Sequence, residues 1–200
     1  VILRAMRDEL ERSRKLRLVQ NDAPYYIEYE LDDLDSFSIV ASEGAIVSTG
    51  ESKARIPRVQ VRVGDYAFDN TNYLFSDFFA NGGRGRVPIE NSYDAIRHQF
   101  WLATDRVFKG SVEAISRKRA ALRNVTQQEK LNDFAKAAPY QSLNPPTKAV
   151  HKQADWTRTS RELSAIFTAF PKVIRSQVEM DVSYSTSYFV NTEGTELRYP

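Results

Sequence analysis

The chain has 200 residues, of which 42% are hydrophobic and 12% aromatic, a composition that supports one packed domain and argues against disorder. Lysine and arginine total 28 against 26 acidic residues, and this net charge of +2 argues against nucleic-acid binding. The chain has no cysteine, which excludes disulfides, thiolate metal ligands and cysteine nucleophiles, and no apolar run approaches the ~20 residues that span a membrane.

The N-terminal third combines a helical pattern with strand patterns. Residues 2–18 carry apolar side chains at helical spacing and predict an amphipathic surface helix. After residue 24 the apolar period falls to two, which is typical of strands buried on one face. Turns are predicted at Asp32–Asp35 and at Glu43–Gly44, and the short connections favour an antiparallel meander. The predicted strands cover residues 25–31, 37–41, about 45–49, and 58–63.

A long helical pattern from Asn91 to Arg123 is predicted to be the central packing element. Asn91 is expected to be its N-cap, followed by negative charge in the first turn. Four large side chains are predicted to pack against the strands at 25–31 and 59–63. These side chains are Phe100, Trp101, Val107 and Phe108.

The rest of the chain alternates irregular segments with regular ones. Residues 69–90 and 139–150 are predicted to be irregular, and the glycine-rich run at 82–86 favours a surface loop over a phosphate-binding loop. Helices are expected at 125–138 and 158–170, followed by strands at 178–190 and 195–199. The order predicts an α+β fold, with an antiparallel sheet of five to six strands and helices on one face. We expect residues 1–200 to be a single domain cut from a longer chain.

Chemistry within these residues is not expected. The two histidines, His98 and His151, lie in different elements, and neither has the spacing of a zinc-binding helix. The acidic run Asp32–Asp35 lacks the glycine and the distal glutamate of a calcium loop. No nucleophile elbow or P-loop occurs. We therefore assign no catalytic, cofactor-binding or metal-binding residue to this sequence, and expect the isolated chain to bind no structural zinc and to hydrolyse no peptide.

Three passages resemble the N-terminal domain of TldD/PmbA-related proteins: Val61–Asn72, Tyr93–Lys109 and Tyr188–Gly194. That family contains predicted zinc metallopeptidases and inactivated relatives, once described as modulators of DNA gyrase. Its zinc helix lies in the C-terminal half, and nothing in this sequence matches it. The resemblance therefore implies that zinc could be bound beyond Pro200, or that the parent protein is an inactivated member.

The resemblance also implies partners and a compartment. Family members form dimers around a cavity in which peptides are cut, so a related subunit and a peptide substrate are the expected partners, with no nucleic acid and no membrane. A cytoplasmic protein is implied, although an exported form stays open. The strand at 178–190 has a polar row that suits the wall of a wet cavity, and an ordinary strand with one solvated face is the simpler alternative. The candidate cavity-lining residues are Glu179, Asp181, Ser183 and Ser185. A stand-alone peptide-binding module that uses an exposed strand edge is the alternative function.

Overall fold

Two strands of nineteen residues, β1 (Pro24–Ser42) and β2 (Ala45–Val63), form a long antiparallel hairpin. The computed structural model describes residues 1–18, 23–72, 87–124, 131–146 and 152–200. Glu43 and Gly44 make the two-residue turn with φ angles of 51° and 83°, which matches the twist of the two strands. The predicted turn at Glu43–Gly44 is confirmed.

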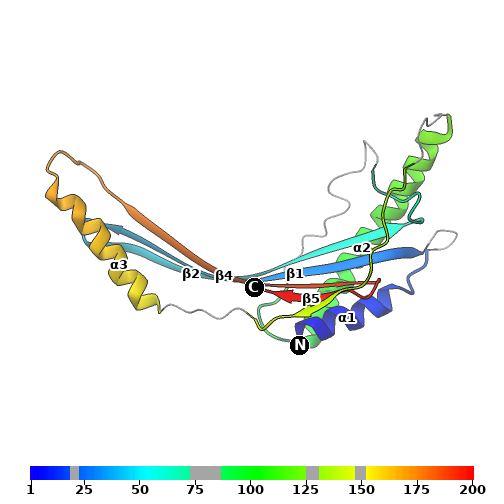
Figure 1. Ribbon diagram of the computed structural model, residues 1–200, viewed down its shortest axis with the longest axis horizontal. Coiled ribbons are helices and arrows are strands. Elements are labelled where there is room, and N and C mark those ends of the chain that lie inside the picture. The colour runs from blue at the N-terminus through cyan, green and yellow to red at the C-terminus, as the bar shows by residue number, and fades with distance from the viewer. Residues whose placement is uncertain (19–22, 73–86, 125–130, 147–151) are drawn as a thin grey trace.

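The remaining strands extend this hairpin into a five-stranded sheet (Figure 1). The order across the sheet is β2-β1-β4-β5-β3, and only the pairing of β3 with β5 is parallel. The predicted α+β class is therefore confirmed. The three further strands are β3 (Gln141–Leu143), β4 (Val178–Asn191) and β5 (Glu196–Tyr199).

The predicted turn at Asp32–Asp35 is wrong, because β1 continues through these residues without a break. Both neighbouring strands pair with this acidic stretch, so its backbone groups are satisfied on both sides. Its charges are also compensated: Arg55 donates to both carboxylate oxygens of Asp33 at 3.1 and 3.2 Å. Asp32 accepts hydrogen bonds of 2.6 Å from Arg58 and from Ser187. Four expected short strands are thus two long ones.

In the described residues, three α-helices accompany the sheet: α1 (Ile2–Ser13), α2 (Tyr93–Ala121) and α3 (Gln153–Ala165). Short 3₁₀ turns follow two of them, Leu122–Asn124 after α2 and Ile166–Ala169 after α3. The pairing of β1 with β4 has no register shift, so the odd-numbered residues of β1 stay on one face along the whole strand. All three helices pack on this helix-bearing face, as predicted. None of the helices in the described residues is long and apolar enough to cross a membrane.

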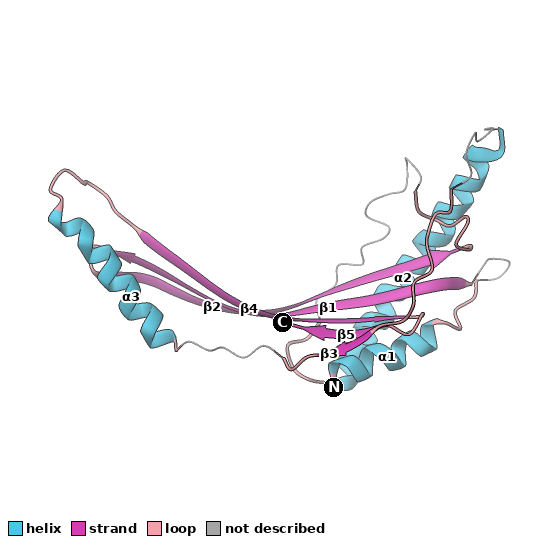
Figure 2. Ribbon diagram, viewed as in Figure 1, coloured by secondary structure: helices cyan, strands magenta, loops and turns pink. Residues whose placement is uncertain are grey.

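The helices divide this face into two parts, which we call the proximal and distal halves (Figure 2). In the proximal half, α1 and α2 cover residues 27–31 of β1 and 59–63 of β2. In the distal half, α3 lies alone beside the hairpin tip. The long strands bend between the halves, and α1 and α3 lie on the outer side of the bend (Figure 1). The opposite, helix-free face is therefore on the inner side of the bend, and we call it the inner face.

The core lies in the proximal half and follows the predicted pattern, with one exception. Phe100, Val107 and Phe108 are buried, and the Phe100 ring stacks on Tyr29 with centroids 4.8 Å apart. Trp101 was expected in this core, but it is 41% exposed. It follows Phe100 directly and therefore points about 100° away around the helix. The core of α2 is a narrower stripe than the sequence indicates.

Two further expectations at helix ends need correction. The N-cap of α2 is Ser92, whose hydroxyl accepts a hydrogen bond from the backbone N–H of Ala95, whereas Asn91 accepts a 2.6 Å hydrogen bond from Arg55. No helix occurs over residues 131–138, which are held instead by side chains from elsewhere, such as Lys118 to Asp133. Residues 125–130 of that expected helix, the glycine-rich run at 82–86, and His151 lie outside the described residues.

Candidate functional site

The inner face of the sheet brings the predicted polar row of β4 beside polar side chains of β1 and β2. Ser183 lies opposite Ser36, and Ser36 lies opposite Ser52, so that three serines form one rung across three strands. The hydroxyls of Ser36 and Ser52 are 2.9 Å apart and hydrogen-bonded. The next rung toward the hairpin turn consists of Asp181, Ser38 and Gly50.

These two rungs form the floor of a shallow hollow with a volume of about 260 Å³. Gly50 keeps the hollow open, because a Cβ atom there would lie 2.9 Å from the Ser38 hydroxyl. A floor of serines and glycine lets a polypeptide backbone approach closely and offers it donors and acceptors. The side chains and backbone that line the hollow come from Ser36, Phe37, Ser38, Gly50, Glu51, Ser52, Asp181, Val182 and Ser183.

The carboxylates of the inner face differ between the two halves. In the proximal half, Arg58 donates to Glu30 at 2.7 and 2.9 Å and to Asp32 at 2.6 Å, so charges there compensate one another. The hydrogen bonds that Arg58 donates to Glu30 raise the pKa of the Arg58 guanidinium. In the distal half, Glu179 and Asp181 are exposed and form no ion pair within the described part of the chain. The distal inner face therefore presents uncompensated negative charge.

The four candidate cavity-lining residues of β4 share one face of the sheet. Glu179, Asp181, Ser183 and Ser185 all lie on the inner face, as the alternation along β4 requires. Asp181 and Ser183 line the hollow, whereas Glu179 and Ser185 lie beyond its two ends. The serine partners on β1 and β2 were not predicted. Their sequence signal is serine at even-numbered positions of both strands, and the strand register is needed to bring these serines together.

The distal part of β4 is also an open edge. Only Ser187–Val190 pair with β5, and within the described residues Val178–Tyr184 pair with β1 on one side and with no strand on the other. An edge strand of this length presents unpaired backbone donors and acceptors to a neighbouring chain. The inner face and this edge meet along the same strand.

The other polar clusters of the molecule hold the fold together. Asp69 accepts hydrogen bonds from Tyr25 at 2.7 Å, Arg62 at 2.8 Å and Thr71 at 2.6 Å. Burial raises the pKa of Asp69, but the hydrogen bonds from Thr71, Arg62 and Tyr25 outweigh it, and the pKa lies below its ordinary value. Such a carboxylate is saturated by protein groups and has a structural role.

Metal binding finds no support in the described part of the chain, where no three histidine, aspartate or glutamate side chains gather in a way that could hold an ion. His98 is exposed on α2 and stacks on Trp101 with ring centroids 5.4 Å apart. His98 is therefore a helix-surface residue.

Comparisons with known proteins returned solved structures only, since no family model and no curated protein matches the chain. TldE from Thermococcus kodakarensis matches with a TM-score of 0.48 and 8% sequence identity, over 98% of this chain and 36% of that one. A proposed modulator of a DNA gyrase from Thermotoga maritima matches with a TM-score of 0.44 and 13% identity, over 87% of this chain and 33% of that one.

The chain thus spans about a third of the length of both structures. Because both TM-scores are below 0.5, these matches do not indicate an activity, a substrate or a partner for this chain. Both structures are of TldD/PmbA-related proteins, the group that the sequence motifs resemble. The predicted resemblance is therefore confirmed. The chain is similar to TldE and gyrase-modulator proteins.

Proposed function

We propose that this chain is a non-catalytic domain of a TldD/PmbA-like protein, and that its inner face lines a cavity in which an extended peptide is held. The observation that supports the proposal is the distal inner face: a helix-free sheet surface with a serine rung, a hollow of about 260 Å³ and two carboxylates that form no ion pair with any described residue. A solvated strand surface with no role needs neither the aligned serines nor the glycine that keeps the hollow open.

The chemistry of this surface defines what it holds. Serine hydroxyls donate and accept hydrogen bonds, so they pair with the backbone of a peptide whatever its sequence. Glu179 and Asp181 add attraction for a peptide with net positive charge. No group on this surface is placed as a nucleophile with a base, so any cleavage is performed by another part of the protein.

Charge reversal at the two carboxylates tests the proposal. The double variant Glu179→Lys, Asp181→Lys should weaken the binding of a labelled, unstructured twelve-residue peptide of glycine, serine and lysine by about tenfold or more in fluorescence anisotropy. Processing of the same peptide by the full-length protein should fall in parallel. Both residues are exposed, so the unfolding midpoint should stay nearly unchanged.

A matched control separates local from global charge. Glu113→Lys, Glu162→Lys makes the same change in net charge at exposed positions of α2 and α3, and should leave peptide binding nearly unchanged. The proposal fails if the inner-face variant binds and processes the peptide as the wild type does at unchanged stability. It also fails if both double variants lose binding equally.

The open edge of β4 supports a second candidate, a module that binds a peptide by adding it to the sheet as a strand. A peptide methylated on alternate backbone nitrogens distinguishes the two candidates, because it cannot pair with a strand edge and can still lie across the inner face. Loss of binding on methylation favours the edge, and retained binding favours the face. The same edge could instead pair with a related subunit, which would raise the molecular mass in light scattering.

A further inference from the structure

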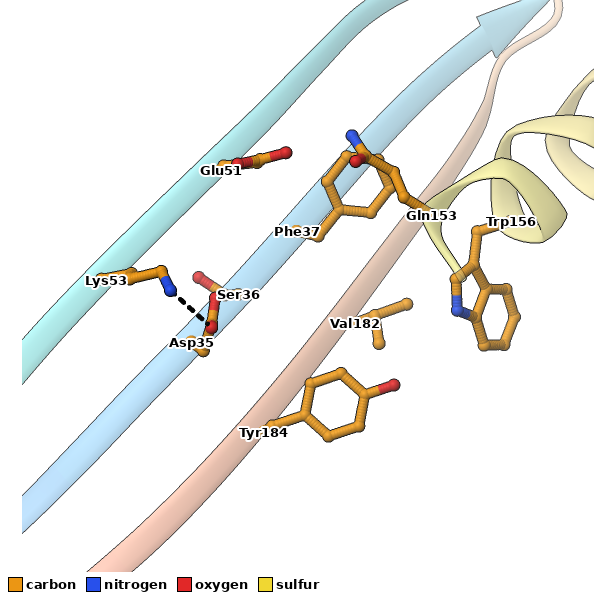
Figure 3. Close-up of a pocket in the computed structure, with 9 residues that line it drawn as sticks. All are labelled: Asp35, Ser36, Phe37, Glu51, Lys53, Gln153, Trp156, Val182 and Tyr184. Atoms are coloured by element: carbon orange, nitrogen blue, oxygen red, sulfur yellow. Dashed lines mark ion pairs between the residues drawn. The ribbon is translucent and has the colours of Figure 1, made fainter. Parts of the chain in front are cut away.

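A second pocket lies on the opposite, helix-bearing face, between the distal half of the sheet and the start of α3 (Figure 3). Its volume is about 280 Å³. The thickness of the sheet separates this pocket from the inner face. Ligand binding in the pocket therefore does not depend on peptide binding on the inner face. Its lining residues are Asp35, Ser36, Phe37, Glu51, Lys53, Gln153, Trp156, Val182 and Tyr184.

Strand register orders the floor of the pocket into two rows. Glu51, Phe37 and Val182 lie opposite one another on three strands and make the first row. Lys53, Asp35 and Tyr184 make the second row in the same way.

The first residues of α3 close one side of this floor. In Figure 3 the indole of Trp156 stands beside Val182, and Gln153 reaches over Phe37. The pocket therefore has aromatic walls on two sides and charged groups at the β2 end.

The charges of the pocket leave one group without a partner. Lys53 and Asp35 form an ion pair of 3.1 Å, in which both side chains are largely exposed. Glu51 forms no ion pair within the described residues. The formal charge of the lining is therefore −1. The N-terminal dipole of α3 is opposed by Asp155 in its first turn, so the helix does not reverse this sign.

A polar group in the pocket also favours ligand binding. The hydroxyl of Tyr184 is buried and has no hydrogen-bond partner in the described part of the chain. Burying such a group unpaired costs free energy that a ligand with donors would recover. A carboxylate at one end, flat aromatic walls and an unpaired hydroxyl together match a planar cation that carries several N–H groups.

We infer that this pocket binds the guanidinium group of an arginine side chain from a polypeptide partner. The aliphatic stem of the arginine packs on Val182 and against Trp156, and its planar head lies toward β2, where its N–H groups donate to Glu51. Lysine fits less well, because its ammonium group is compact, strongly hydrated and unable to stack or to bind a carboxylate in bidentate fashion.

Small molecules test the pocket without any peptide. Butylguanidinium and butylurea have the same shape, and only the first is charged. The protein has two tryptophans, so two indole N–H signals report in a ¹H–¹⁵N NMR spectrum, with Trp101 as an internal control on α2. Butylguanidinium should shift the Trp156 signal at concentrations about tenfold below those at which butylurea does, and Trp101 should stay unchanged. Equal effects of the two compounds, or shifts at Trp101 alone, would overturn the inference.

Peptide titrations then distinguish binding of an arginine side chain from binding of a free guanidinium compound. Two unstructured peptides of glycine, serine and threonine, one with a central arginine and one with neutral citrulline, are titrated into the protein by calorimetry. The arginine peptide should bind about tenfold more tightly. In the variant Glu51→Gln most of that preference should be lost, whereas Glu113→Gln at an exposed position of α2 should keep it. Glu51 is exposed, so the variant is expected to fold.

The outcomes are distinguishable from those of the proposed function. If both peptides bind equally, or if the preference survives Glu51→Gln, the arginine pocket is wrong while peptide binding on the inner face stands. If neither peptide binds and butylguanidinium still shifts Trp156, the pocket takes the free cation, and arginine of a polypeptide is the wrong source. If Trp156 responds to neither compound, the inference fails outright.

Discussion

The proximal and distal halves use the same three strands for different purposes. In the proximal half, Tyr29 and Leu31 of β1 face Val59 of β2 and the apolar stripe of α2, and all are buried. At the equivalent positions of the distal half the helix-bearing face carries Asp35 and Lys53. Strand pairing therefore continues well past the end of the core, and the extension is free to carry binding surfaces.

The covering helices differ in the same way. α2 buries large side chains against the sheet, whereas the only residues of α3 that are buried are Ser160 and Ser164. Ser164 accepts a hydrogen bond of 3.0 Å from the backbone N–H of Gly44, which ties α3 to the hairpin turn. The apolar side chains that follow α3 are exposed, with Ile174 at 97%. Most of the folding free energy is therefore expected from the proximal half.

The largest effect is expected from truncating the core of the proximal half. Phe100→Ala should lower the free energy of unfolding by about 3–5 kcal/mol, because the ring is fully buried and its loss leaves a cavity. Phe37→Ala in the half-buried distal pocket should cost less than half as much. Urea denaturation of both variants measures the difference, and equal losses would contradict the division into two halves.

A smaller effect is expected at Lys118, which is buried and donates to the backbone oxygen of Thr71 and to the carboxylate of Asp133. Lys118→Met should cost about 2 kcal/mol, because both acceptors lose a charged donor. The segment around Asp133 should also become more accessible to protease. A variant as stable as the wild type would show that this segment does not help to hold the proximal half.

In the distal half, Gly44→Ala should cost about 1–2 kcal/mol, since Gly44 has a φ of 83° that disfavours a side chain. The added methyl group would also lie 3.3 Å from the Cβ of Ala165 in α3. Thermal unfolding measures the loss, and Gly50→Ala is the comparison because its backbone is not left-handed. No loss at Gly44 would mean that the turn and α3 contribute nothing to stability.

The Asp69 cluster should make the proximal half sensitive to acid. Because its folded-state pKa lies below the ordinary value, the carboxylate contributes stability that is fully present above the unfolded pKa of about 3.9 and is lost as the pH falls through the folded pKa. The difference in unfolding free energy between the wild type and Asp69→Asn should therefore shrink from pH 6 toward pH 2. A constant difference over that range would contradict this role for the charge.

The smallest effect is expected at Trp101, which the sequence pattern predicted to be a core residue, a position where truncation to alanine would cost about 3–5 kcal/mol. Its side chain is 41% exposed and contacts His98 and the guanidinium of Arg12, 5.9 Å from the ring. Trp101→Ala should therefore cost less than about 1 kcal/mol in urea denaturation. A loss as large as that of Phe100→Ala would place Trp101 in the core after all.

Most helices and strands could be predicted from the sequence, because periodicity is a local property. Alternation over 178–190 and helical spacing in 91–123 predicted β4 and α2, and the glycine of Glu43–Gly44 between two strand patterns predicted the turn. The same local signals failed at Asp32–Asp35, where an acidic run that is typical of a turn lies inside a strand. Pairing on both sides and two arginines outweigh its low strand propensity.

Which side chains lie beside one another depends on the tertiary structure. The serine rung joins Ser36, Ser52 and Ser183, and the pocket on the other face joins Phe37, Trp156 and Tyr184. Each set comes from three elements that are far apart in the chain, and a shift of one residue in the register would move every one of these strand side chains to the opposite face. Periodicity states which side of a strand a residue occupies, but only the pairing of strands and the docking of α3 state what lies beside it.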